Sequence, residues 1–424
     1  MLKRYSIAFV ALLLMLAAAT LQTGAADPAP DRYIIFTEDQ AASDCIAKEV
    51  GKKGGAVLKP LALQHQNGLV VQINKSTLED IAGSQGVKAI EPDVKMSAVW
   101  NPLADHGSSG QNQPDEILPW GIAWIKAGDV WDTDGDLAVD PCAGAGAGIK
   151  VAIVDSGIDR NHPDLADNLA GGINLLLGSS ENTNSNWNDY YGHGTHVAGI
   201  VAAADNNIGV IGAAPRARLY SVRVLDNKGR GYSSDLIDAM YWCVDNGINI
   251  ANLSVGIPRE IMDQKPNTRD ALEAAFNYAY GNGVLLVAAA GNLNPYAPLP
   301  PVTDDNVDYP ARFDNVMAVS AIDQTGARFP YSKTGPAVEI AAPGVQIAST
   351  FLKDSYFSLI GTSMAAPHVT GAAALVMATG HVTDLNGNGI ADEVRAILRN
   401  SAASGNPLLG RGTVNADQAV KDAN

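Results

Sequence analysis

The sequence predicts an α/β fold, a mostly parallel sheet with helices on both faces, preceded by a small α+β unit. Two observations support this prediction. From about residue 117, continuous apolar runs alternate with helical stretches, which is typical of parallel strands buried on both faces. Before residue 100, shorter apolar runs are separated by turn signals, and a Pro-, Gly- and Ser-rich stretch divides the two parts.

Five apolar runs are expected to form the buried strands of the larger part. They cover residues 149–154, 219–225, 248–253, 284–289 and 316–321, with helices expected over 233–244 and 268–280. The smaller part is expected to hold strands over 33–36, 68–73 and 87–90, and a helix over 76–82 capped by Ser76 or Thr77. Active residues of parallel sheets gather beyond the carboxyl ends of the strands.

The first residues have the features of an export signal. Two basic residues precede an apolar run over 7–19 that is too short to span a bilayer, and small residues at 24–26 offer a cleavage point. We therefore expect a secreted protein with no membrane contact once residues 1–26 are removed. The alternative is an uncleaved anchor helix.

The composition limits the kinds of partner. The 424 residues are 46% hydrophobic and 17% charged, enough for one large domain beside a smaller one. A net charge of −16 argues against nucleic acid or a polybasic membrane contact, because phosphate binding needs a basic surface. Acidity instead suits solubility and divalent cations.

Three cysteines, Cys45, Cys142 and Cys243, leave one thiol over in an oxidising compartment. Cys45 lies in the part expected to be removed. Two alternatives stay open: Cys142 pairs with Cys243, or both are buried free thiols.

Four segments carry residues suited to nucleophilic catalysis. A buried strand ends at Asp155, and a helix rich in small residues begins beside His193. A third segment ends in Asn292, and a fourth places Ser363 at the start of a helix with Pro367 expected in the first turn. A serine becomes nucleophilic when an imidazole takes its proton, and a buried carboxylate fixes that imidazole. Asn292 and the Ser363 backbone N–H are candidate donors to the developing oxyanion.

These segments, in the order Asp, His, Ser, resemble those of the subtilisin-like serine proteases. The resemblance covers about residues 117–420, and the upstream part is similar to the family's inhibitory propeptide. It implies a secreted, monomeric serine endopeptidase of broad specificity, whose propeptide is an intramolecular inhibitor and folding aid until self-cleavage. The implied organisation is a signal peptide over 1–26, a propeptide over 27–100, a linker or processing region over 101–115 and a peptidase domain over 116–424.

The resemblance also implies an extended peptide substrate that pairs with two strand edges. The residues expected in this cleft are Gly229, Arg230, Gly231, Ser254, Val255, Gly256, Ala289, Gly291 and Asp308. Asp308 aligns with the base of the primary pocket, where a carboxylate would favour Lys or Arg. The expected self-cleavage region, 96–100, is apolar, so broad specificity for apolar residues is favoured and a basic preference is the alternative.

Two loops are candidates for structural calcium, which takes oxygen ligands. The first resembles the family's strong calcium loop, and its expected ligands are Glu116, Asp164, Ala204, Asn206, Ile208 and Val210. The second has oxygen groups at alternate positions, as in an EF-hand, at Asp384, Asn386, Asn388 and Asp392. Its twelfth position is Arg395 instead of Glu, so a solvated turn is the alternative. Asp132, Asp134 and Asp136 form a weaker case of the same kind.

Other functions fit the motifs less well. His193 and His196 are three residues apart, whereas zinc proteases space two histidines by four with a Glu between them. We therefore expect His196 and His368 to be packing residues. Ser363 lacks the Gly-x-Ser-x-Gly context of hydrolase-fold esterases. A catalytically inactive binding module or a calcium-binding structural protein would bind its ligand without hydrolysing peptides.

Overall fold

The computed structural model describes residues 32–63, 66–99, 114–176, 184–301, 304–403 and 406–424. The predicted export signal and nearly all of the predicted linker lie outside these residues. Within the described residues, no helix is both long enough and apolar enough to cross a membrane.

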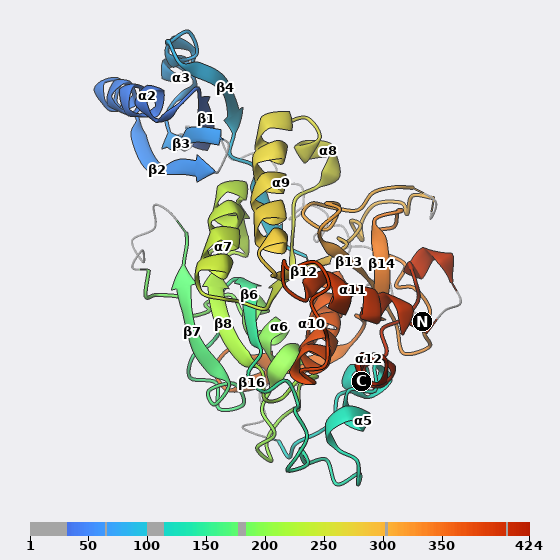
Figure 1. Ribbon diagram of the computed structural model, residues 1–424. Helices are drawn as coiled ribbons and strands as arrows, with labels where there is room; N and C mark the ends of the chain where they lie inside the picture. Colours follow the sequence, from blue (N-terminus) through green and yellow to red (C-terminus); the bar gives the residue numbers. More distant parts are fainter. Residues whose placement is uncertain (1–31, 64–65, 100–113, 177–183, 302–303, 404–405) are drawn as a thin grey trace, which may run out of the picture.

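A seven-stranded parallel sheet forms the centre of the larger part (Figure 1). Its strand order is β14-β13-β12-β10-β6-β8-β7. After β6 the chain forms β7 at one edge and then β8 between β7 and β6, and it next crosses to β10 and runs outward to β14. The carboxyl end of β6 therefore lies where the strand order reverses. The strands are β6 (Lys150–Asp155), β7 (Leu169–Asn174), β8 (Arg218–Arg223), β10 (Ile250–Leu253), β12 (Leu285–Ala289), β13 (Met317–Ile322) and β14 (Val338–Pro343).

The predicted fold class is confirmed, and the sheet is parallel throughout. Each of the five predicted strands is present. The apolar pattern missed β7, which contains two glycines and is mostly half-buried, and β14, which contains a glutamate and ends in proline. Both are edge strands, where burial on two faces is not required.

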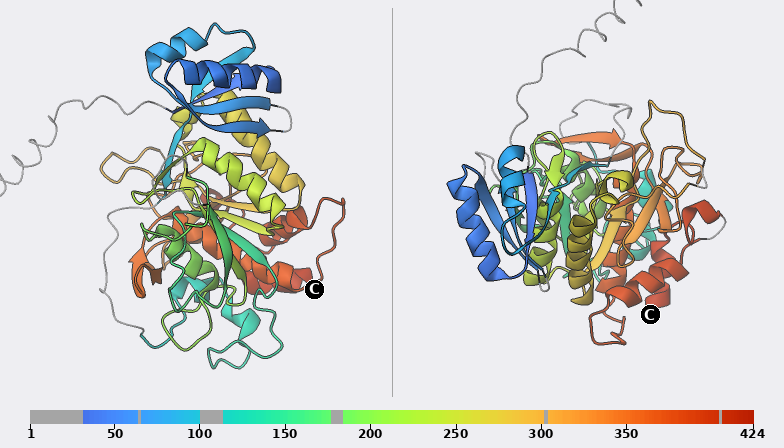
Figure 2. Two further views of the ribbon diagram at one scale, coloured as in Figure 1. Left: turned by 90° about the vertical axis from the view of Figure 1, so that its left-hand side faces the viewer. Right: turned by 90° about the horizontal axis from the view of Figure 1, so that it is seen from above.

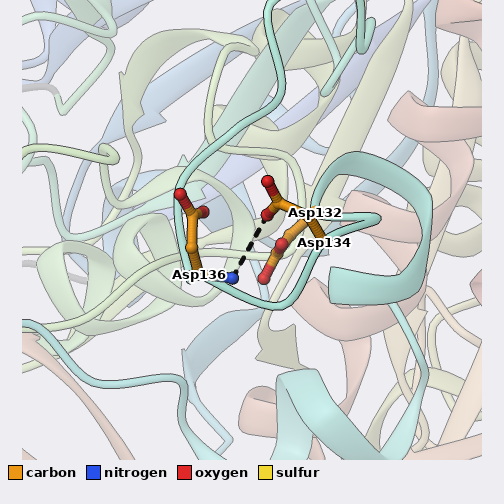
Figure 3. Close-up of side chains that lie close together, drawn as sticks. All are labelled: Asp132, Asp134 and Asp136. Atoms are coloured by element: carbon orange, nitrogen blue, oxygen red, sulfur yellow. Dashed lines mark hydrogen bonds between the residues drawn. The ribbon is translucent and has the colours of Figure 1, made fainter.

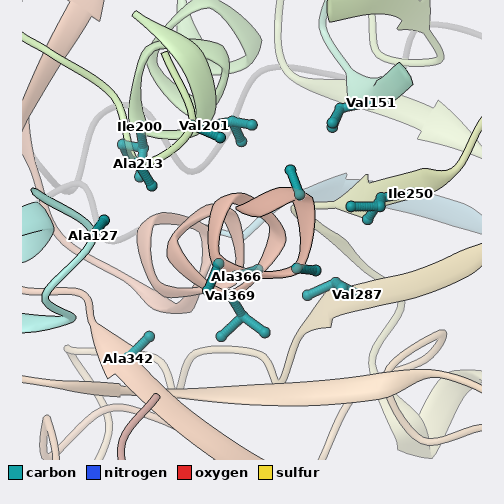
Figure 4. Close-up of a cluster of buried hydrophobic side chains, with 14 of the residues drawn as sticks. Ala127, Val151, Ile200, Val201, Ala213, Ile250, Val287, Ala342, Ala366 and Val369 are labelled. Atoms are coloured by element: carbon teal, nitrogen blue, oxygen red, sulfur yellow. The ribbon is translucent and has the colours of Figure 1, made fainter. Parts of the chain in front are cut away.

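Helices cover both faces of this sheet, and each face has its own core. Val151 and Ile153 of β6 pack with α6 and α10, whereas Ala152 and Val154 pack with α7 and α9. Helix α10 runs through the first core among small and branched side chains (Figure 4). The helices are α4 (Trp120–Trp124), α5 (Gly128–Trp131), α6 (His193–Ala202), α7 (Ser233–Asp245), α8 (Arg259–Met262), α9 (Pro266–Gly281), α10 (Thr362–Ala378), α11 (Ala391–Asn400) and α12 (Ala416–Ala423).

The smaller part is an antiparallel sheet in the order β2-β3-β1-β4, with α2 and α3 on one face. Its other face carries Ile34, Phe36 and Val70, which belong to the same core as α7 and α9. Figures 1 and 2 show this part seated on those two helices. Its elements are β1 (Arg32–Thr37), α2 (Gln40–Lys52), β2 (Ala56–Leu63), β3 (Gln66–Gln72), α3 (Lys75–Ile81) and β4 (Val87–Pro92).

One local expectation is wrong, and one question that the sequence left open is answered. Helix α3 is capped by Asn74, whose side chain accepts the Thr77 N–H at 2.9 Å, and not by Ser76 or Thr77. The cysteines are free: Cys243 is buried on α7, whereas Cys45 and Cys142 are exposed. Cys142 and Cys243 are thus free, as in the second alternative, although Cys142 is exposed and not buried as that alternative had it.

A substitution of Phe276 tests the core beneath α9, because this residue is fully buried and its ring centroid lies 5.6 Å from that of Phe313. Phe276→Ala is expected to lower the free energy of unfolding by about 3–5 kcal/mol through lost burial and a cavity. The neighbouring exposed change Asn277→Ala is expected to alter it by less than about 0.5 kcal/mol. Denaturant titrations measure both, and equal effects would contradict the packing described.

Candidate active site

Asp155 ends β6 and His193 begins α6, and the structure brings their side chains together. His193 Nδ1 lies 2.8 Å from Asp155 Oδ1 and 2.9 Å from Oδ2, and both residues are buried. The Ser156 backbone N–H also donates to Asp155, at 2.7 Å. The carboxylate thereby favours the tautomer protonated at Nδ1 and leaves Nε2 able to accept a proton. Within the described residues, His193 Nε2 has no hydrogen-bond partner.

Asp189, which sequence reasoning missed, holds the amino end of α6. Its carboxylate accepts the backbone N–H groups of Tyr191, Gly192 and Thr195 and the Thr195 hydroxyl, at 2.7–3.0 Å. Burial raises the pKa of Asp189, and these hydrogen bonds oppose the rise. The contacts fix the start of the helix that carries His193. The sequence signal for this role is an aspartate a few residues before the glycine that caps the amino end of a helix.

Ser363 lies in the first turn of α10 beside the chain's own segment before residue 100. Its Oγ donates to the carbonyl oxygen of Val99 and lies 3.1 Å from that of Ser254. The hydroxyl therefore faces the Val99 carbonyl in this structure, while the imidazole of His193 stays unpaired at Nε2 within the described residues.

The Val99 carbonyl oxygen accepts two further hydrogen bonds. Asn292 Nδ2 donates at 3.0 Å and the Ser363 backbone N–H at 3.2 Å. Thr362, which sequence reasoning also missed, donates to Asn292 Oδ1 from its backbone at 3.1 Å and from its hydroxyl at 3.2 Å. These contacts orient the amide so that its NH₂ group faces the carbonyl, the arrangement required of an oxyanion donor.

Pro367 is the sixth residue of α10, so its expected place in the first turn is wrong. A proline in the second turn lacks the N–H that would bond the carbonyl four residues earlier, that of Ser363. Ser254 Oγ donates to this carbonyl at 2.8 Å instead. Ser254 also accepts the Val99 N–H through its own carbonyl, at 3.1 Å. Because Pro367 has no N–H, the Ser363 carbonyl is left to accept the hydrogen bond of Ser254. This bond links the start of α10 to the segment between β10 and β11.

An extended segment of the chain, β5 (Lys95–Ala98), lies in the predicted cleft as the middle strand of a three-stranded sheet. It pairs antiparallel with β9 (Arg230–Tyr232) and with β11 (Val255–Gly256). The Gly229 carbonyl accepts the Ala98 N–H at 3.1 Å. The register places Met96 opposite Gly231, Ser97 opposite Arg230 and Gly256, and Ala98 opposite Val255.

A cavity of about 500 Å³ adjoins the end of β5 and is lined by Val99, Gly256, Asn292, Asp308 and Lys333, among others. Lys333 Nζ lies 2.6 Å from Asp308 Oδ1, an ion pair that sequence reasoning missed because 25 residues separate the partners. Of the other predicted pocket residues, Ala289 is buried in the core and Gly291 lies behind Asp308. A Cβ at Gly291 would come within 2.3 Å of the Asp308 carboxylate, so only glycine fits there.

The first candidate calcium loop surrounds Asp164, which is fully buried. Asp164 Oδ2 accepts the Val210 N–H at 3.1 Å, while Oδ1 has no partner within the described residues. Burial raises the pKa of Asp164 to about 7. Glu116 accepts the Asn206 N–H at 3.0 Å, which brings a second carboxylate to this loop. The predicted ligands at 204, 208 and 210 contribute carbonyl oxygens that accept no hydrogen bond from the described chain.

The second candidate loop curls around Asp384, whose carboxylate accepts the Gly387 and Gly389 N–H groups at 2.7 and 3.0 Å. Asn386 Nδ2 donates to Asp392 Oδ2 at 2.5 Å. Glu393, missed by the comparison with an EF-hand, reaches back to the Leu385 N–H at 2.9 Å. Three oxygen atoms are shielded from water without a hydrogen-bond partner within the described residues: Asn388 Oδ1, Asp392 Oδ1 and Glu393 Oε2.

The third acidic loop brings oxygen atoms of Asp132, Asp134 and Asp136 within 4.8 Å of one another at the surface (Figure 3). Asp132 accepts the N–H groups of Gly135 and Leu137 at 2.7 and 3.0 Å. The backbone of the loop itself thus satisfies this carboxylate, and we assign no ion to the cluster.

His196 and His368 are both fully buried, as expected of packing residues. His196 Nε2 lies 3.0 Å from the carbonyl oxygens of Ile347 and Phe357, and His368 Nδ1 lies 2.8 Å from that of Met364. Burial lowers the pKa of His196 to about 3 and that of His368 to about 4, so both imidazoles are neutral near pH 7.

Comparisons with known proteins show which family the chain resembles. The model of the subtilase family matches residues 146–421. An alkaline protease of Alkalihalobacillus alcalophilus is 34% identical over 427 residues, which cover 98% of each chain. Subtilisin BL of Lederbergia lenta is 40% identical over 308 residues, 72% of this chain and 100% of that protein. Subtilisin E of Bacillus subtilis (strain 168) is 32% identical over 395 residues, 92% of this chain and 90% of that protein.

Asp189→Asn tests the support of α6. The amide presents an NH₂ group where the carboxylate accepts, so buried N–H groups lose their partner and the free energy of unfolding is expected to fall by about 1–3 kcal/mol. Asp314→Asn, at an exposed position, is the matched control, expected within about 0.5 kcal/mol of the parent. Denaturant titration compares the two, and an unchanged midpoint for Asp189→Asn would refute the role assigned to its carboxylate.

Proposed function

This chain belongs to the subtilase family and is a serine endopeptidase, and on that premise we propose that it is a secreted, monomeric enzyme made as a self-processed zymogen. Asp155, His193 and Ser363 hydrolyse the peptide bond. The observation that carries the proposal is the Val99 carbonyl, which lies against Ser363 Oγ and accepts hydrogen bonds from Asn292 and from the Ser363 N–H.

The proposed reaction begins when the Ser363 hydroxyl turns from the carbonyl oxygen toward His193 Nε2. The imidazole takes the proton as Oγ attacks the carbonyl carbon, and the Asp155 carboxylate stabilises the imidazolium that forms. Asn292 and the Ser363 N–H stabilise the oxyanion, and His193 then gives its proton to the leaving nitrogen as the C–N bond breaks. Water hydrolyses the acyl-enzyme with His193 as base. The buried Nε2 supports this role because it has no competing partner among the described residues.

The bond cleaved first is the one between Val99 and Trp100 in the same chain. Val99 supplies the carbonyl beside Ser363, and β5 pairs with β9 and β11 as an extended substrate would. Strand pairing is largely independent of side chains, which supports broad specificity for polypeptides.

The smaller part, residues 27–100, is proposed to act as the tethered inhibitor and folding aid. Glu91 accepts the Thr268 N–H at 2.8 Å near the start of α9, and Asp93 accepts the Ser234 N–H at 3.0 Å near the start of α7. Carboxylates at helix amino ends are stabilising because they face unpaired N–H groups and the positive end of the dipole. Through these contacts the propeptide stabilises two helices of the enzyme while β5 blocks its cleft.

Calcium is proposed to stabilise two loops and takes no part in the bond-breaking step. Asp164, Asn206 and Glu116 would hold one ion together with the carbonyl groups at 204, 208 and 210. The fit is supported by Asp164, since a buried carboxylate whose Oδ1 has no partner among the described residues needs a cation or a proton. Asp384, Asn386, Asn388 and Asp392 would hold a second ion, with Glu393 in the place of the missing carboxylate at position twelve.

Self-processing is the direct test of the proposed function. The wild-type chain is expected to lose its residues up to Val99 and to gain Trp100 as its new N-terminus, whereas Ser363→Ala stays whole. Asn292→Ala is expected to process roughly 10²–10³-fold more slowly, a magnitude that comes from subtilisin itself. Asn246→Ala, an exposed control, should process at the parent rate. Intact mass and N-terminal sequencing follow the reaction, and cleavage in Ser363→Ala would rule out processing by this serine.

Calcium binding predicts a stability difference. In the Ser363→Ala background, calcium at about 100 times its Kd adds about 2.7 kcal/mol per site to the free energy of unfolding. Asp164→Asn should remove one site's contribution and Asp392→Asn the other's, while the exposed control Asp167→Asn should keep both. Unfolding with calcium and with a chelator measures the difference, and titration calorimetry counts the ions. A chelator without effect on the parent chain would disprove structural calcium.

A further inference from the structure

The Asp308–Lys333 ion pair forms part of the pocket that adjoins the Val99 side chain. Asp308 precedes the turn beside β11, and the side chain of Lys333 reaches it from the segment after β13. The two side chains are only 8% and 11% exposed. A Cβ built at Gly256 would lie 2.7 Å from Val99 Cγ2 and 3.4 Å from Asp308 Oδ2. The absence of a side chain at Gly256 therefore lets the valine side chain and the carboxylate both lie close to its backbone.

Other charged side chains lie near Asp308, but Lys333 is its ion-pair partner. Glu260 also lines the cavity, and its charge opposes ionisation of Asp308. The guanidinium of Arg259 lies 3.1 Å from Asp263 and 3.3 Å from Asp305, so its charge is engaged away from Asp308. Burial raises the pKa of Asp308 to about 6 even though Lys333 opposes the rise. Above about pH 6, Asp308 is thus ionised, and the positive charge of Lys333 balances its negative charge.

Resting on the proposed function, we propose that Lys333 determines the residue preference of the enzyme: by neutralising Asp308 it restricts cleavage to bonds that follow uncharged, chiefly apolar residues. A lysine or arginine side chain entering the pocket would meet the ammonium of Lys333 and an Asp308 carboxylate that is already paired, whereas the Glu260 carboxylate is on an exposed residue and is screened by water. A glutamate would meet Asp308. Both charged residues would lose their hydration without gaining an unpaired opposite charge. The chain's own segment before the scissile bond, Met96 to Val99, is uncharged, as this preference requires.

Either partner of the Asp308–Lys333 ion pair can be replaced, and the two replacements are expected to change the residue preference in opposite directions. Lys333→Met leaves Asp308 to favour Lys and Arg, and Asp308→Asn leaves Lys333 to favour Glu. Each freed charge is expected to raise kcat/KM for its complementary residue, relative to leucine, by roughly 30-fold, as for other desolvated charge pairs. Lys333→Arg keeps the pair and should keep the wild-type ratios. The double change Asp308→Asn/Lys333→Met removes both charges and should gain neither preference.

The assay uses peptides that differ only in the residue before the cleaved bond: leucine, valine, lysine, arginine and glutamate. It is run on processed enzyme at alkaline pH, above the Asp308 pKa of about 6. Cleavage of the leucine peptide by the processed wild-type enzyme, abolished when a serine-directed sulfonyl fluoride modifies Ser363, tests the proposed function separately. If that peptide is cleaved but both single variants keep the wild-type ratios, or if the wild-type enzyme already prefers lysine, the role of Lys333 is overturned. If one single variant does not fold, the other decides the matter, because each predicts a gain of its own.

Discussion

Parallel alignment of the central strands is the constraint on which the site depends. Parallel strands end at a common edge, so residues that follow β6, β10 and β12 meet there although more than 100 positions separate Asp155 from Asn292. Helices α6 and α10 begin at the same edge and bring His193 and Ser363 with them. The positive end of α10 also faces the carbonyl where negative charge would develop. One topological feature thereby brings together the groups proposed as base, nucleophile and oxyanion donor.

Contacts behind the site hold these groups in place. Asp189 fixes the start of α6, Thr362 orients the Asn292 amide, and Ser254, between β10 and β11, donates to the Ser363 carbonyl. The contacts of Asp189 and Ser254 are buried and those of Thr362 are partly buried, and a buried polar group without its partner costs about 1–3 kcal/mol. The same cost makes the geometry specific, because alternative orientations would leave donors or acceptors unpaired. Pro367 contributes because it has no N–H, so the Ser363 carbonyl can accept the hydrogen bond of Ser254.

The smaller part meets the larger one through both apolar and charged contacts. Its sheet shares a core with α7 and α9, and Arg32 lies buried between Asp93 at 2.7 Å and Asp235 at 2.9 Å. The β5 strand continues this interface into the cleft. After the proposed cut at Val99, only these non-covalent contacts would hold the smaller part, and its release would expose Asp235 to water. The proposed inhibition and the support of the two helices therefore depend on one surface.

The sequence by itself determined the fold class, the five strands with continuous apolar runs, and the four residues proposed to do the chemistry. These features can be predicted from short segments of the sequence, because burial pattern and motif spacing are local properties. It misplaced Pro367 and left the disulfide open. It could not show that Lys333 neutralises Asp308, that Glu393 reaches the loop of Asp384, or that Val99 is the residue whose carbonyl meets Ser363. Only the tertiary structure decided these points, because each depends on which distant segments pack together and on which buried charges then face one another.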